Sequence, residues 1–177
     1  MSDCKLICAI KDNVKRVRNI PGDVFNDNIK KEEINEIIIP NGVKQIEDSF
    51  TGWGFETITI PNSVELIMMD AFKACPNLKK IEVAKGNNKI CMNMYAFALC
   101  PNLENLSIYS NDAIISSRAF EDCKKLETVV IKGANVNIRS KAFEGCKNLK
   151  TLSIPENAEV AEDAFLGCDK VPDKYKK

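Results

Sequence analysis

The feature that most constrains this chain is a phenylalanine that recurs at nearly equal intervals. Seven of the eight phenylalanines follow one another at steps of 22 to 25 residues: Phe25, Phe50, Phe72, Phe97, Phe120, Phe143 and Phe165. A period of roughly 20–29 residues is typical of solenoids, in which each unit is too small to bury a core alone and neighbouring units stack. The sequence therefore predicts a stack of similar coils.

Other residue types keep fixed distances from this Phe. Five cysteines follow it by three positions, and Trp53 takes that position after Phe50; the cysteines are Cys75, Cys100, Cys123, Cys146 and Cys168. An apolar triplet such as Leu126, Val129 and Ile131 comes next, and an apolar pair precedes the following Phe. Such alternation predicts short strands that stack as parallel sheets about 4.8 Å apart. The Phe-to-Cys spacing predicts a short helical turn with both side chains facing inward.

The repeated pattern Ala-Phe-x-x-Cys-x-x-Leu-x-x-Ile-x-Ile resembles the BspA-like, or Treponema pallidum-type, leucine-rich repeats. The segment Ser140–Cys168 is a close match, and the resemblance runs from about Val17 to Val171. It implies a leucine-rich-repeat solenoid, a right-handed β/α superhelix rich in strands with short helical turns, and about six coils of ~23 residues. It also implies protein binding and, as in many bacterial and protozoan members, surface adhesion.

The ends of the chain depart from the repeat. Because a solenoid exposes its core unless its ends are capped, we expect residues 1–16 to form an N-terminal cap. The solenoid then covers residues 17–171, and residues 172–177 form a polar tail. The first residues lack a cationic segment followed by a long apolar one, so no secretory signal is predicted. We expect a cytoplasmic protein, or a cell-surface one if this chain is a fragment of a longer protein.

Composition excludes several classes of function. Lysine and arginine number 25, aspartate and glutamate also number 25, and histidine is absent. The zero net charge does not favour nucleic acid or an acidic membrane, and the lack of histidine excludes Ser-His-Asp catalysis and histidine metal ligands. Acidic residues alternate with lysine at outward positions, which is typical of a solvated face. We predict no enzyme activity, catalytic residue, cofactor or metal.

The cysteines allow two interpretations. A column of five thiols could be a metal or redox array, but buried cysteine is usually a small packing residue. No Cys-x-x-Cys pair is present, and such a pair is typical of cysteine-rich zinc sites. We therefore interpret the column as structural. Any reactive thiol is expected among Cys4, Cys8 and Cys91, which lie outside the column.

Apolar and aromatic residues at expected outward positions, at the corner of a coil or directly after a strand form the candidate binding surface. They are Trp53, Leu66, Met68, Met69, Met94, Tyr95, Tyr109 and Ile114. Methionine and aromatic side chains together are typical of protein interfaces, although irregular coils could instead turn them inward as filler. The sequence predicts a non-catalytic protein-recognition module whose partner is a protein of unknown identity. The alternatives are a stoichiometric inhibitor that acts by occlusion, an adhesin-type repeat domain, and self-association.

Overall fold

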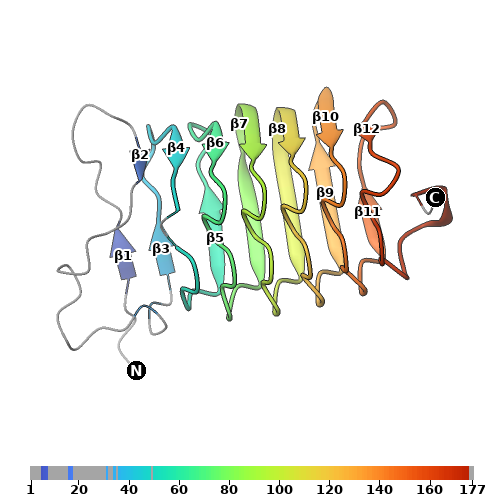
Figure 1. The fold of residues 1–177 in the computed structure, drawn as a ribbon. Coiled ribbons are helices and arrows are strands. Elements are labelled where there is room, and N and C mark those ends of the chain that lie inside the picture. Colours follow the sequence, from blue (N-terminus) through green and yellow to red (C-terminus); the bar gives the residue numbers. More distant parts are fainter. Residues whose placement is uncertain are drawn as a thin grey trace.

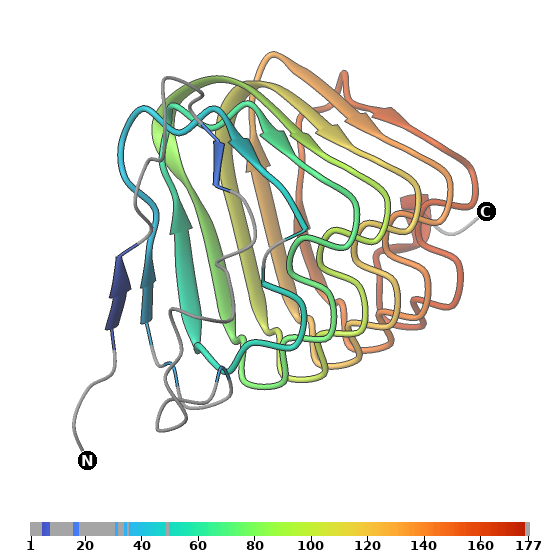
Figure 2. The same ribbon diagram turned by 60° about the vertical axis from the view of Figure 1, so that its left-hand side comes forward.

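The computed structural model describes residues 5–7, 16–17, 31, 34, 36–48 and 50–175 of the chain, with the backbone alone at 5–7, 16–17 and 87–88. Successive coils stack side by side along one axis, and each coil contains a first strand, a second strand and a returning turn region (Figure 1). Seen after rotation, the coils enclose a continuous interior (Figure 2). Cys4, Cys8 and Phe25 lie outside the described residues.

The strands form two columns of one parallel sheet (Figure 1). The first column contains β1 (Lys5–Ile7), β3 (Glu36–Ile38), β5 (Thr57–Ile60), β7 (Lys80–Met92), β8 (Asn105–Ile115), β9 (Thr128–Lys132) and β11 (Thr151–Ser153). The second column contains β2 (Arg16–Val17), β4 (Gln45–Ile46), β6 (Leu66–Ile67), the second halves of β7 and β8, β10 (Asn135–Ile138) and β12 (Glu159–Val160). A 3-10 helix, η3 (Asp173–Tyr175), follows the last coil.

Equivalent residues of the repeat meet in register, as the solenoid prediction requires. Ile58 pairs with Ile81, Ile81 with Leu106, and Leu106 with Val129. All four are buried, and their neighbours along each strand are more exposed. In β8, for example, buried positions alternate with half-buried or exposed ones. Burial of this aliphatic column stabilises the stack, because each fully buried side chain adds about 1.5–3 kcal/mol.

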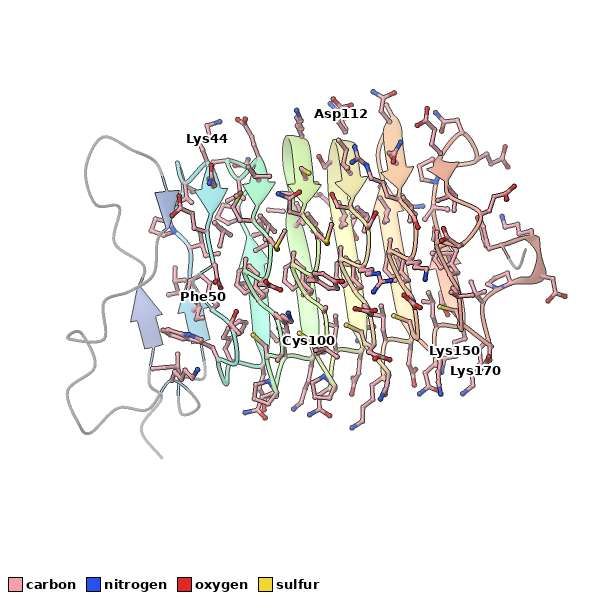
Figure 3. All side chains as sticks on the ribbon, viewed as in Figure 1. Lys44, Phe50, Cys100, Asp112, Lys150 and Lys170 are labelled. Carbon is pink, nitrogen blue, oxygen red and sulfur yellow. The ribbon has the colours of Figure 1, made fainter. Side chains whose placement is uncertain are left out.

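The phenylalanine column forms a continuous stack of rings inside the coils. From Phe50 to Phe165 the centroids of successive rings lie 4.9–5.4 Å apart, and their planes differ by only 4–12°. The spacing follows the distance between coils, so each ring packs on the one before it. Figure 3 shows Phe50 and Cys100 on the inner side of the coils, while Lys44, Lys150 and Lys170 point outward.

The predicted helical turn between Phe and Cys is wrong. These segments form hydrogen-bonded turns, and the residue two positions after the Phe has positive φ, as Leu99 does at 59°. A left-handed residue interrupts an α-helix. The Phe N–H also donates to the next coil, as from Phe97 to the Ala119 carbonyl at 2.8 Å, rather than to a residue of its own turn. Pairing between coils therefore replaces the helix.

Both ends of the described stack carry contacts beyond the predicted solenoid boundaries. β1 pairs with β3 and β2 pairs with β4, which extends both strand columns into residues assigned to the cap. At the other end, the ring of Tyr175 packs against Phe165 at 5.7 Å, so the predicted polar tail includes a core contact. The domain boundaries themselves stay predictions.

Candidate functional site

The cysteine column is a set of hydrogen-bond donors between coils. Each thiol donates to the carbonyl oxygen of the Phe in the preceding coil, at 3.0–3.2 Å, from Cys75, Cys100, Cys123, Cys146 and Cys168. All five are buried and unbridged. A thiol fits this position because it combines small volume with one donor, which satisfies a buried carbonyl.

Burial makes Cys123, in the middle of this column, a poor site for thiol chemistry. It raises the pKa of the Cys123 thiol well above its usual range, and the neighbouring thiols of Cys100 and Cys146 add to the effect. The thiolate is the reactive form of cysteine, so a protonated and buried thiol is inert. Among the residues that the structure describes, no group of three or more His, Cys, Asp or Glu is arranged to hold a metal ion.

An apolar column lies on the outer face of the second strand column. Cys91 on β7 pairs with Leu66 on β6 on one side and with Ile114 on β8 on the other. All three side chains are half-buried. Gln45 and Asn137 occupy the same position in the flanking coils, so polar residues border the column on both sides. Parallel strands place these side chains about 4.8 Å apart, close enough for one continuous surface.

Two exposed methionines extend this column past the ends of the strands. Met69 and Met94 occupy equivalent positions in adjacent coils and are 48% and 38% exposed. The Asp70 N–H donates to the Met94 carbonyl at 3.4 Å, which holds the two turns together. Met68 is half-buried beside them, and the Asn93 side chain donates to its sulfur at 4.0 Å. We call the following set the methionine surface: Leu66, Met68, Met69, Cys91, Met94, Tyr95 and Ile114.

Tyr95 is positioned by two cations from neighbouring coils. Lys73 Nζ lies 5.1 Å from its ring centroid, and Arg118 Nη1 donates to its hydroxyl at 3.4 Å. The hydrogen bond to Tyr95 raises the pKa of the Arg118 guanidinium, and the charges of Glu121 and Glu144 add to this. Because arginine is charged at any physiological pH, these contacts hold the ring in one place across that range.

Two of the predicted surface residues do not belong to this surface. Trp53 is only 5% exposed and packs edge-on against Phe50 at 5.3 Å, so it fills the inward cysteine position and cannot meet a partner. Its assignment to the binding surface is therefore corrected. Tyr109 is half-buried on β8 with Lys85 Nζ 5.5 Å from its ring centroid, five residues before Ile114 and thus about 16 Å away along the strand.

Cys91 belongs to the same surface, as its predicted outward position beside Leu66 and Ile114 indicated, although it was not among the candidate contact residues. The sequence pattern already indicated an outward position between Ile90 and Met92, both of which are buried. Its sulfur lies 4.0 Å from the Ser116 hydroxyl, at the centre of the apolar column. Strand pairing was needed to show that it joins Leu66 to Ile114.

Within the described part of the chain, no helix is both long and apolar enough to cross a membrane. No protein with a curated description matches the chain significantly.

Solved structures of repeat proteins share the fold. The leucine-rich-repeat protein of T. pallidum, TpLRR, is 22% identical, with a TM-score of 0.52 over 89% of this chain and 92% of that one. A leucine-rich-repeat protein from Bacteroides ovatus ATCC 8483 is 19% identical, with a TM-score of 0.51 over 78% of this chain and 43% of that one. Identities this low indicate a common fold and nothing about a shared partner.

The family itself is shown by the repeat. The sequence model for the BspA type leucine rich repeat region matches residues 47–172 in six copies. The match begins at the Phe50 unit, later than the Val17 expected from the residue pattern. The matched repeat accounts for the stacked phenylalanines, the thiol donors and the paired aliphatic strands. This chain therefore belongs to the BspA-type leucine-rich-repeat family.

Proposed function

We propose that this protein is a non-catalytic recognition module that binds a protein partner through the methionine surface. The observation that carries the proposal is the pair of exposed methionines, Met69 and Met94, side by side next to a half-buried apolar column. Exposed apolar side chains that form one patch on a protein usually mark a contact. Methionine adapts its shape to a partner, and a polar border is typical of interfaces.

The scaffold beneath this surface supports binding at low entropic cost. Each coil is tied to the next by parallel strand pairing and by turn hydrogen bonds such as Phe72 N–H to the Ala96 carbonyl at 2.7 Å. A surface that is already ordered loses less conformational entropy when a partner binds. The repeat therefore presents a preformed face, and the partner meets several coils at once.

The test is capture of a partner from the native host by the tagged protein, with two charged variants beside the wild type. Met94→Glu plus Tyr95→Glu places charge in the methionine surface, and Met69→Glu plus Met94→Glu does so without altering the Tyr95 contacts. Ile38→Glu is the matched control, because Ile38 is also 39% exposed but lies on β3. We expect one protein to be held by the wild type and by Ile38→Glu and lost from both double variants.

Two outcomes would contradict the proposal. Capture that survives both double variants, with native circular dichroism, would remove the methionine surface as the contact. Unfolding of Met69→Glu plus Met94→Glu would mean that these side chains are core residues. An activity assay on the captured protein then separates an inhibitor that acts by occlusion from an adaptor. Localisation by cell fractionation separates the predicted cytoplasmic protein from a surface adhesin.

A further inference from the structure

We propose that Met69 and Met94 form a reversible oxidation site, where hydrogen peroxide converts both thioethers to sulfoxides and thereby blocks partner binding at the methionine surface. The effect on binding rests on the proposed function, whereas the oxidation rests on the two side chains alone. These side chains lie at equivalent positions of adjacent coils, in the turns that follow β6 and β7.

The methionines that the structure describes differ strongly in exposure. Met69 and Met94 are 48% and 38% exposed. Met68 is half-buried, and Met92 is fully buried in the core. Met92 is the last residue of β7 and faces inward, whereas Met94 lies in the turn two residues later and faces solvent. Because an oxidant must reach the sulfur atom, the fold directs oxidation to Met69 and Met94 and protects Met92.

The oxidation step transfers one oxygen atom to sulfur. The thioether sulfur attacks one oxygen of hydrogen peroxide, the S–O bond forms as the O–O bond breaks, and the second oxygen leaves as water. The sulfur loses two electrons and the peroxide gains them. In the reverse direction, a methionine sulfoxide reductase restores the thioether while two thiols form a disulfide and the oxygen leaves as water. Because the reductase must take the side chain into its own active site, an exposed sulfoxide is the kind that it repairs.

Oxidation makes the exposed part of the methionine surface polar. Each sulfoxide carries an oxygen atom that is hydrated in the free protein and loses its water when a partner covers it. A partner whose surface fits the thioether offers no donor to this oxygen, so each oxidised side chain weakens binding. The Asp70 N–H donates to the Met94 carbonyl at 3.4 Å and joins the two turns, so a partner that covers one methionine also meets the other.

The fold itself does not depend on these two thioethers. The turn that carries Met94 is held by backbone pairing between coils, as from the Asn93 N–H to the Ile67 carbonyl at 2.9 Å. The sulfur of the half-buried Met68, by contrast, accepts a hydrogen bond from the Asn93 side chain at 4.0 Å. Oxidation of the exposed pair, Met69 and Met94, therefore changes recognition and leaves the stack of coils intact.

The first measurement is the rate of oxidation at each methionine of the full 177-residue protein in hydrogen peroxide, followed by tandem mass spectrometry of its peptides. We expect Met69 and Met94 to react about tenfold faster than Met92, or more, in the folded protein. In concentrated urea the three rates should become equal. The circular dichroism spectrum should stay native once the exposed pair has reacted. Equal rates in the folded protein, or unfolding when this pair is oxidised, would overturn the proposal.

A variant that cannot be oxidised at this site tests the consequence for binding. Met69→Leu plus Met94→Leu keeps two apolar side chains of similar volume and removes both sulfur atoms. After peroxide treatment, we expect the wild type to capture roughly tenfold less of its partner, while the leucine variant captures as much as before. Methionine sulfoxide reductases A and B with a dithiol should restore capture by the wild type. Capture lost equally from the leucine variant would overturn the proposal.

A second variant and the untreated protein separate the remaining explanations. Cys91→Ala should stay as sensitive to peroxide as the wild type, and loss of that sensitivity would place the effect on the thiol and overturn the proposal. Equal capture by the untreated and the oxidised wild type would contradict the oxidation switch and leave the proposed function standing. No capture by the untreated wild type would contradict the proposed function, and the switch with it.

Discussion

The Cys123 thiol donates a hydrogen bond to the carbonyl oxygen of Phe97, 26 residues earlier in the chain, at 3.2 Å. Both residues are fully buried. The contact joins two coils through the one polar group that this position can offer. It favours cysteine over another small apolar residue at this position, because the thiol gives the buried Phe carbonyl a donor from the next coil, in addition to the backbone N–H that several of these carbonyls accept from their own turn.

Replacing this cysteine should therefore cost more than its volume suggests. We expect Cys123→Ala to lower the free energy of unfolding by about 2 kcal/mol, since it removes a buried sulfur and a hydrogen bond together. Urea denaturation measures this directly. Cys91→Ala is the control, because Cys91 is half-buried on the outer face and should cost less than about 1 kcal/mol. Equal costs for the two variants would contradict a structural role for the thiol donor.

The raised pKa of Cys123 predicts a pH dependence of stability. Folding holds this thiol protonated, while the unfolded chain ionises it near its ordinary value of 9.0, so unfolding releases a proton above that pH. Its contribution is fully present below about pH 9 and falls as the pH rises, by up to about 1.4 kcal/mol per pH unit. Urea titrations between pH 8 and 10 under reducing conditions should show a steeper decline for the wild type than for Cys123→Ala. Parallel declines would exclude this thiol as the cause.

The stacked rings predict the largest single loss. Phe120 lies between Phe97 at 5.3 Å and Phe143 at 5.2 Å and is fully buried. Phe120→Ala should lower the free energy of unfolding by about 3–5 kcal/mol, because the coils on both sides hold the cavity open. Thermal or urea unfolding checks it. A loss under about 1 kcal/mol would mean that the column is not a packed core.

A close approach of two coils makes Gly133 irreplaceable. A Cβ atom at this position would lie 2.2 Å from the Ser110 carbonyl oxygen and 2.9 Å from that of Asn111, and both belong to backbone that strand pairing holds in place. We expect Gly133→Ala to lower the free energy of unfolding by more than about 2 kcal/mol. Gly42→Ala is the matched control. A Cβ atom at Gly42 would meet no atom within 4 Å, so the only cost, about 1 kcal/mol, comes from the positive φ of +94°. Urea denaturation of both variants compares the two costs, and a reversed order would contradict this close approach of the coils.

The inward positions of the repeat could be predicted from the sequence because they are periodic. Phe72, Cys75, Leu78 and Ile81 recur at constant offsets, and each is fully buried in the structure. Burial of that kind depends only on which residues face the axis of the stack. The outward placement of Met69 and Met94 follows from the same alternation and is present in the structure.

Periodicity did not predict the conformation of the turns or the burial of Trp53 in the irregular coil that begins at Phe50. The Phe-to-Cys spacing fits a helical turn, but hydrogen bonds from the Phe N–H to the next coil and the positive φ of Leu99 exclude a helix there. Trp53 was expected at the surface because it lies at the corner of its coil, yet it is buried edge-on against Phe50, the first ring of the described stack.

The sequence by itself determined the family, the stack of coils and the side chains that fill it, because identical spacing forces identical residues into contact with one another. Only the tertiary structure decided which of the outward residues are paired across neighbouring strands. Leu66, Cys91 and Ile114 are 23 or more residues apart in sequence and become neighbours through strand register.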